Sequence, residues 1–229
     1  QVFMYLGEQN NRTDQVRQGL EYAKHANMLY GKMKDSAGWV VGRNVEGILF
    51  RSYAMLGDST YYDSAMACYQ DALALITRSG KGRRYIGILY NNISQFYIEY
   101  KKDYPAALRY LMAAVQANQH ENTIVRLSYN YGNIAQVYQL MGNRRLSLDY
   151  AYRTLEYARR TTLTNRLLNA YKQLYDSYNA FGAADSALRY YLLYDGLRDS
   201  LAGRDVSRQI AEIQTKYQME KNKALIDRL

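Results

Sequence analysis

Small side chains recur at helical spacing along most of the chain and predict a series of antiparallel helix pairs. Two predicted helices carry a small–large–small pattern with offsets of four and then three residues, which places all three side chains on one helical face. The two sets are Ala65, Tyr69 and Ala72, and Ala107, Leu111 and Ala114. The small residue that opens the second helix of each pair recurs at steps of 46, 42, 40 and 40 residues, at Gly19, Ala65, Ala107, Ser147 and Ala187. Because two helices approach closely only where a side chain is small, these positions predict the joints between paired helices.

A tyrosine near the end of each predicted first helix gives a second landmark with almost the same period. The steps are 44, 41 and 40 residues, at positions Tyr53, Tyr97, Tyr138 and Tyr178. Because two independent landmarks agree, chance is a poor explanation of the repeat. We expect these rings to fill the space beside the small residues. A chain of stacked helix pairs has a long groove instead of one central core, and such proteins usually bind partners.

The pattern divides the chain into three parts, all of them helical. Residues 1–38 are predicted to hold a partial repeat, with one helix over residues 14–34 and its partner at or before residues 4–6. Residues 39–200 are predicted to form four helix pairs, at about 40–78, 84–118, 123–160 and 164–200. After a break at residues 199–203, a separate helix is expected over residues 203–229, starting near residue 205. Its apolar stripe fits heptad spacing, which indicates either a cap on the last pair or the start of a coiled coil that forms a homodimer: Val206, Ile210, Ile213 and Tyr217.

The repeated unit resembles the tetratricopeptide repeat (TPR). The place of the repeat's Trp is held by Tyr90, Tyr131 and Tyr171, and that of its Leu by Leu49, Ile93, Ile134 and Leu174. The repeat has a small residue at its next conserved position. Here that position holds a small residue at Ser94 and Ala135 but a bulky one at Phe50 and Tyr175. The period of about 40 exceeds the usual 34 and is similar to that of bacterial peptide-sensing regulators and kinesin light chains. The resemblance covers nearly all of residues 15–200 and implies an α-α superhelix, a right-handed solenoid whose first helices line a concave groove.

The resemblance also implies which side chains face a ligand. In such stacks the ligand-facing positions fall one and five residues after the Trp position, with a further one a turn on. Here they are Arg51, Asn91, Gln95, Gln136, Lys172, Asp176 and Asn179. Amide side chains offer both a donor and an acceptor to the backbone of an extended peptide, and Arg51 or Lys172 could hold a carboxylate. The alternative is that these residues only solvate a concave surface.

A second resemblance lies in the tail. Residues 199–201 and 208–217 look like the segment that leads out of the repeats in bacterial membrane-anchored sensor histidine kinases and transcription regulators with an N-terminal TPR region. This implies the sensing region of a two-component system on the extracytoplasmic (periplasmic) side of the inner membrane, although a cytoplasmic location stays open. We expect the sequence to be a fragment, because it starts at Gln1 and ends within a helical pattern, with any membrane tether beyond it.

Composition narrows the function further. The chain has 26 tyrosines but only 4 Phe and 1 Trp. The tyrosines either fill the space between helices as amphipathic side chains, or some of them line the groove and bind a peptide. The formal charge of +9 is spread over scattered basic residues, so no nucleic-acid partner is expected. The single Cys68 excludes an internal disulfide and a CxxC metal site. No phosphate-binding or catalytic motif occurs, so we expect neither an enzyme nor a cofactor.

The sequence therefore predicts a non-enzymatic module that binds a protein or a peptide. The alternative is an assembly or dimerisation scaffold with no small ligand.

Overall fold

The computed structural model describes the backbone of residues 2–121 and 123–226, and most of the side chains between residues 12 and 219. Every regular element in these ranges is a helix, as the sequence predicts. The α-helices are α1 (Val2–Lys32), α2 (Ser36–Met55), α3 (Tyr61–Ser79), α4 (Ile86–Phe96), α5 (Tyr104–His120), α6 (Ile124–Leu140), α7 (Arg144–Arg159), α8 (Thr164–Ala180) and α9 (Ala184–Ile226). Two short elements flank α4: a 3-10 helix, η1 (Arg83–Tyr85), and a π-helix, η2 (Tyr97–Lys101).

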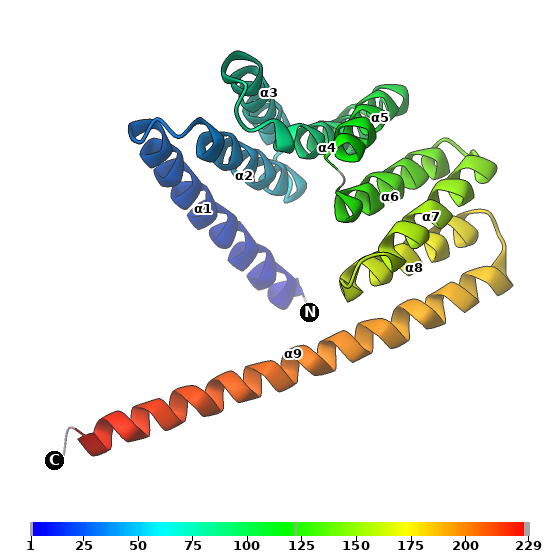
Figure 1. Ribbon diagram of the computed structural model, residues 1–229. Coiled ribbons are helices and arrows are strands. Elements are labelled where there is room, and N and C mark those ends of the chain that lie inside the picture. The colour runs from blue at the N-terminus through cyan, green and yellow to red at the C-terminus, as the bar shows by residue number, and fades with distance from the viewer. Residues whose placement is uncertain (1, 122, 227–229) are drawn as a thin grey trace.

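The helices pack in adjacent pairs that follow one another along a curve (Figure 1). Helix α2 pairs with α3, α4 with α5, α6 with α7, and α8 with the first part of α9, while α1 packs on α2. The core is divided in the same way into three main apolar clusters. One joins α2, α3 and α4, the next joins η2, α5 and α6, and the third joins α6, α7 and α8.

The small residues lie at the joints, as the sequence predicts. Ala107 and Ser147 are fully buried, and Ala65 and Ala187 are nearly so. The large residues between them, Tyr69 and Leu111, are fully buried as well.

Tyrosines fill the space beside these joints in three successive pairs. In each pair one tyrosine of the second helix lies between two tyrosines of the first helix that are seven residues apart. Ring centroids are 5.3 and 6.0 Å apart for Tyr110 with Tyr97 and Tyr90, 5.6 and 6.0 Å for Tyr150 with Tyr138 and Tyr131, and 5.7 and 6.4 Å for Tyr190 with Tyr178 and Tyr171. In the pair α2–α3, Tyr53 instead contacts Tyr61, which follows a longer turn. Most of the tyrosines named by the period are thus fillers between helices.

The turns within the pairs explain why the two landmarks differ slightly in period. The backbone N–H of Asn143 donates to the carbonyl of Tyr138, and that of Ala183 donates to Tyr178, so each bond spans five residues. The matching bond of the pair α4–α5 runs from Asp103 to Tyr97 and spans six. The π-helix η2 absorbs the extra residue, because its wider turns hold one residue more.

Two predicted boundaries are wrong. Helix α1 begins at Val2 and not near residue 14, so residues 4–6 belong to α1 and do not form a partner helix before it. The expected break at residues 199–203 is absent, because α9 continues from Ala184 to Ile226. Glycine weakens a helix by roughly 1 kcal/mol but does not end it, and α9 contains no proline. The side chains of the tail stripe at Val206, Ile210, Ile213 and Tyr217 lie outside the described residues.

Candidate functional site

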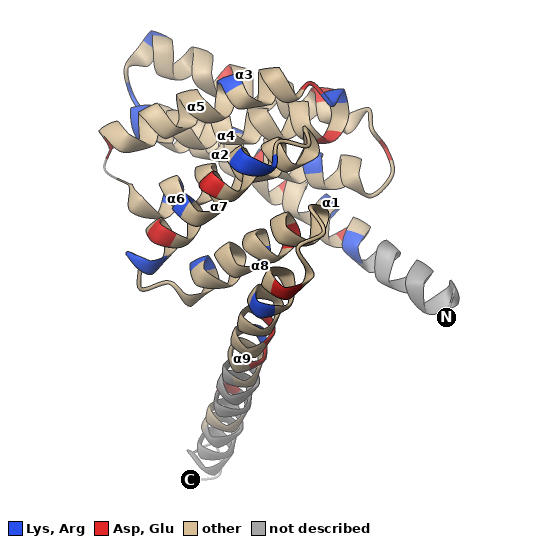
Figure 2. Ribbon diagram, turned by 90° about the vertical axis from the view of Figure 1, so that its right-hand side faces the viewer, with Lys and Arg blue, Asp and Glu red and all other residues tan. Residues whose placement is uncertain are grey.

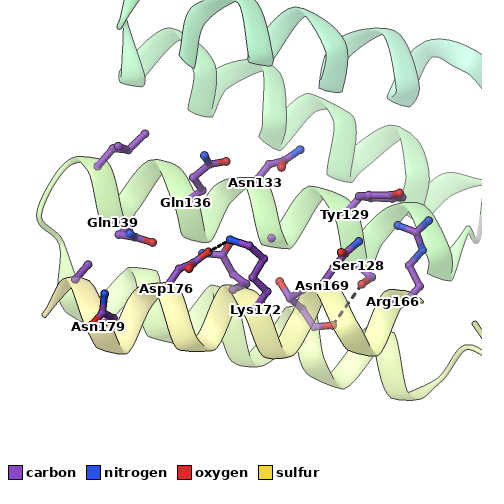
Figure 3. A pocket seen from close by; sticks show the side chains of 15 residues that line it. Ser128, Tyr129, Asn133, Gln136, Gln139, Arg166, Asn169, Lys172, Asp176 and Asn179 are labelled. Atoms are coloured by element: carbon purple, nitrogen blue, oxygen red, sulfur yellow. Dashed lines mark hydrogen bonds and ion pairs between the residues drawn. The ribbon is translucent and has the colours of Figure 1, made fainter. Parts of the chain in front are cut away.

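Two neighbouring cavities lie along the first helices of the later pairs. The first, of about 450 Å³, lies between α6 and α8 (Figure 3). The second, of about 380 Å³, lies between α4, α5 and α6. Tyr129 borders both cavities, and we call the two cavities together the groove.

Helical spacing gathers the polar residues of the first cavity on two facing stripes. Each stripe advances by three or four residues at a time, so its side chains lie on one face of the helix. Helix α6 supplies Tyr129, Gly132, Asn133, Gln136 and Gln139, and α8 supplies Arg166, Asn169, Lys172, Gln173, Asp176 and Asn179. Figure 3 shows the amide side chains of both helices along the space between them.

The structure brings together four of the seven residues that the sequence predicts for the ligand. Gln136, Lys172, Asp176 and Asn179 border the first cavity. Asn91 borders the second cavity. Arg51 and Gln95 border neither of the two.

Arg51 is held by an ion pair within the protein. Its Nε lies 3.1 Å from Oε2 of Glu99, which belongs to η2, and both side chains are mostly buried. Burial raises the pKa of the Glu99 carboxyl, while the nearby Arg51 lowers it. The pair ties α2 to η2, so Arg51 already has a carboxylate partner and is not the open cation that the sequence analysis expects.

Lys172 also has a partner inside the cavity. Its Nζ lies 2.6 Å from Oδ2 of Asp176, one turn further along α8. Exposed ion pairs of this kind contribute little stability, so a ligand could displace either side chain. In the structure as it stands, however, the two charges neutralise each other.

Asn91 belongs to a network of amides that connects α4, α5 and α6. Its Oδ1 accepts from Nδ2 of Asn130 at 3.0 Å and from Nδ2 of Asn133 at 2.8 Å. Asn118, on α5, donates to Oδ1 of Asn130 at 2.7 Å. Asn118 and Asn130 are almost fully buried, where unpaired amides would be costly. The Asn91 oxygen is therefore occupied by structural bonds and is not open to a ligand backbone.

The sequence analysis misses Arg166, which lies at one end of the first cavity. This side chain is 9% exposed, and its guanidinium carbon lies 3.6 Å from the centre of the Tyr129 ring. Its Nε and Nη1 have no hydrogen-bond partner among the described residues. Counting from the Trp position cannot find Arg166, because it lies five residues before Tyr171. One signal was available: Arg166 lies in the first turn of α8, where the helix dipole disfavours a cation.

The described residues show no constellation suited to a metal. No group of three or more His, Cys, Asp or Glu side chains gathers in this part of the chain. His25 is exposed, and so is His120, whose Nδ1 lies 3.9 Å from Glu121. Cys68 is buried in the joint between α2 and α3. The groove thus offers hydrogen bonds and one buried cation.

Charged side chains are spread over the molecule. In Figure 2, the blue segments of Lys and Arg and the red segments of Asp and Glu are scattered over the described helices. Among the described residues, no helix is both long enough and apolar enough to cross a membrane.

Comparison with known proteins identifies the fold and no family. No protein-family model and no curated protein matches the chain. The structure is similar to the crystal structure of BtubC (BKLC) from P. vanneervenii, with a TM-score of 0.57 and 16% sequence identity. The match covers 85% of this chain and 92% of that chain. At this level of identity the likeness shows the all-helical fold alone.

Proposed function

We propose that this chain is a non-enzymatic, TPR-like module that binds a segment of a protein or a peptide in the groove. The observation that carries the proposal is the amide-lined cavity of about 450 Å³ between α6 and α8. The amide side chains of Asn133, Gln136 and Asn169 can donate to and accept from an extended backbone.

The repeated architecture supports this interpretation. Helix pairs recur every 40 residues or so, with buried small residues at equivalent joints, and such a recurrence is typical of an α-α superhelix. In such a superhelix the first helices of successive pairs face one another across a concave surface. Helices α6 and α8 are first helices of successive pairs, and the first cavity lies between them.

We further propose that the module is the sensory or interaction region of a bacterial signal-transduction protein on the extracytoplasmic side of the membrane. Support comes from the resemblance of residues 199–217 to the segment that follows the repeats in membrane-anchored sensors. Helix α8 both lines the groove and packs on α9, which continues without a break into that segment. A ligand that favours one position of α8 would therefore shift the population of positions of α9.

The proposal is tested by filling the cavity without weakening the fold. A Cβ at Gly132 would make only ordinary contacts with Thr154, so Gly132→Leu should fold and place its side chain in the cavity that Gly132 borders. The control is Gly196→Leu on α9, where a Cβ meets nothing within 4 Å. Removing a glycine from a helix interior should stabilise both variants by roughly 0.5–1 kcal/mol.

The readout is affinity for peptides selected from a random library on the unmodified chain. We expect Gly132→Leu to weaken binding by about tenfold or more, because side chain and peptide compete for the same volume. Gly196→Leu should bind as the unmodified chain does. Equal binding by both variants, or a library that yields no binder, would remove the groove from the function.

An assembly scaffold is the alternative, and exposed apolar side chains favour it. Leu188, Leu192 and Leu193 are all exposed on α9, as are Met28 and Leu29 on α1. Light scattering of the full chain and of a chain ending at residue 203 separates the two functions. A dimer that persists after truncation supports assembly through these exposed side chains, and a dimer that is lost supports assembly through the tail. Two monomers exclude both.

A further inference from the structure

Arg166 is a buried cation that the described part of the protein does not neutralise. It projects from the start of α8 toward Tyr129 on α6 and borders the cavity at that end (Figure 3). More than nine tenths of its surface is buried, and Nε and Nη1 both lack a hydrogen-bond partner among the described residues. No carboxylate of these residues lies within ion-pair distance of it.

Such an arrangement is unfavourable unless something else completes it. A buried cation without a counter-charge loses hydration that a stacked ring restores only in part. The acidic residue of the cavity, Asp176, lies ten residues further along α8, or about 15 Å at the rise of a helix. Asp176 is moreover paired with Lys172.

The same end of the cavity is positive for a second reason. Tyr129 and Arg166 lie near the first turns of α6 and α8, so both helices begin at this end. Thr123 and Leu163, which precede the two helices, form no side-chain cap. The partial positive charges of two helix dipoles therefore add to the charge of Arg166.

Resting on the proposed function, we propose that this end of the groove binds a carboxylate of the peptide ligand. Arg166 donates to the carboxylate, and Tyr129 holds the guanidinium plane in place. The rest of the ligand extends toward Gln136 and Asn179, near the other end of the cavity (Figure 3). The groove therefore has a direction, with the acidic group of the ligand at the start of α6 and α8.

A carboxylate fits this site better than a phosphate group does. A phosphate carries nearly two charges and is usually held by several arginines. Here Arg166 is the one guanidinium among the residues that border the first cavity, since Arg126 borders the second cavity, where its Nη1 donates to the carbonyl of Arg84 at 2.8 Å. One cation matches the single charge of a carboxylate.

The test observes Arg166 itself in the full chain. In the ¹⁵N spectrum, the Nε–H signal of Arg166 is identified by its loss in Arg166→Lys. The unmodified chain is titrated with acetyl-trialanine bearing a free carboxylate and, separately, with acetyl-trialanine amide. A third titration with acetyl-Ala-Glu-Ala-amide distinguishes a side-chain carboxylate from a terminal one, and a fourth uses inorganic phosphate at matched ionic strength.

We expect one or both carboxylate peptides to shift the Arg166 signal with saturation, and the amide peptide to leave it in place. Backbone shifts at Gly132 and Asn169 should show at least about tenfold weaker binding of that carboxylate peptide to Arg166→Gln. The inference is overturned if no peptide shifts the signal, if acid and amide shift it equally, or if phosphate shifts it more than either carboxylate does. Selected peptides that bind Arg166→Gln as tightly as the unmodified chain would also overturn it, while leaving the peptide-binding groove intact.

Discussion

At the scale of single residues, a buried carboxylate distinguishes the first full pair from the later ones among the described residues. Glu46 lies seven residues before Tyr53, in the place that Tyr90 holds relative to Tyr97. Glu46 is 5% exposed, forms an ion pair with Arg43, and lies 3.9 Å from the sulfur of Cys68. A polar cluster thus replaces the tyrosine cluster in this pair, which makes its stability more sensitive to charge.

Glu99 should give the folded state a distinct pH dependence. Because burial raises its pKa, the folded chain holds this proton more tightly than the unfolded chain does. The contribution to folding is complete below the unfolded value near 4.5 and is lost as the pH rises through the folded value.

We therefore expect the free energy of unfolding of the unmodified chain, relative to Glu99→Gln, to fall as the pH is raised from 4.5 toward neutrality. Urea denaturation at a series of pH values measures this difference. A difference that rises with pH would show that Arg51 outweighs burial at this site.

At the scale of elements, the turns repeat one geometry with different residues. Lys102, Gly142 and Gly182 hold equivalent left-handed positions, with φ of 55°, 72° and 71°. A side chain at such a position costs roughly 1–2 kcal/mol, which glycine avoids. The strain at Lys102 accompanies the π-helix, so this turn departs from its neighbours in two ways.

Exchanging the residues of two turns should therefore have opposite effects. We expect Lys102→Gly to stabilise the protein by up to about 1 kcal/mol, after allowing for the greater freedom of glycine in the unfolded chain. Gly142→Lys should destabilise it by about 1–2 kcal/mol. Chemical denaturation measures both, and effects of the same sign would contradict the assigned backbone geometry.

The joints between paired helices should not tolerate a larger side chain. Ala107 is fully buried among Ile98, Leu111 and Ile134. We expect Ala107→Leu to lower the free energy of unfolding by about 1–3 kcal/mol through overpacking. Gln116→Leu, at an exposed position of the same helix, should stay within about 0.5 kcal/mol of the unmodified chain. Equal stabilities of the two variants would contradict the placement of Ala107 in a tightly packed joint between helices.

At the scale of the whole molecule, the divided core predicts local unfolding. Each apolar cluster joins three consecutive helical elements. The stability of the helices at one end of the chain therefore depends only indirectly on those at the other end. Leu174 and Leu89 are fully buried in the last and the first cluster, respectively.

We expect Leu174→Ala to increase amide hydrogen exchange mainly in α7 and α8, and Leu89→Ala mainly in α3 and α4. Each truncation should cost about 2–5 kcal/mol locally. Exchange measured by mass spectrometry after digestion resolves the helices. A uniform increase along the chain in both variants would indicate a single cooperative core instead of stacked pairs.

Most of the helix pairing followed from the sequence, because the signals for it are local. A helix places residues three, four and seven apart on one face, so the small residues and tyrosines could be found without knowledge of distant partners. The boundaries of α1 and α9 could not be found in this way. Whether a glycine ends a helix depends on its surroundings, and Gly196 and Gly203 lie where a continuous helix is free to extend.

The sequence by itself determined that this protein is a series of helix pairs with small residues at the joints, because that pattern depends only on residues close together within each repeat. Tertiary structure alone decided which cations are open to a ligand. Arg51 forms an ion pair with Glu99 from another helix pair, whereas the guanidinium of Arg166 stacks on the ring of Tyr129 and has no carboxylate partner among the described residues. The reason is that whether a charge is neutralised depends on the groups nearest to it in space, and these come from positions 48 residues away in the chain for Arg51 and 37 residues away for Arg166.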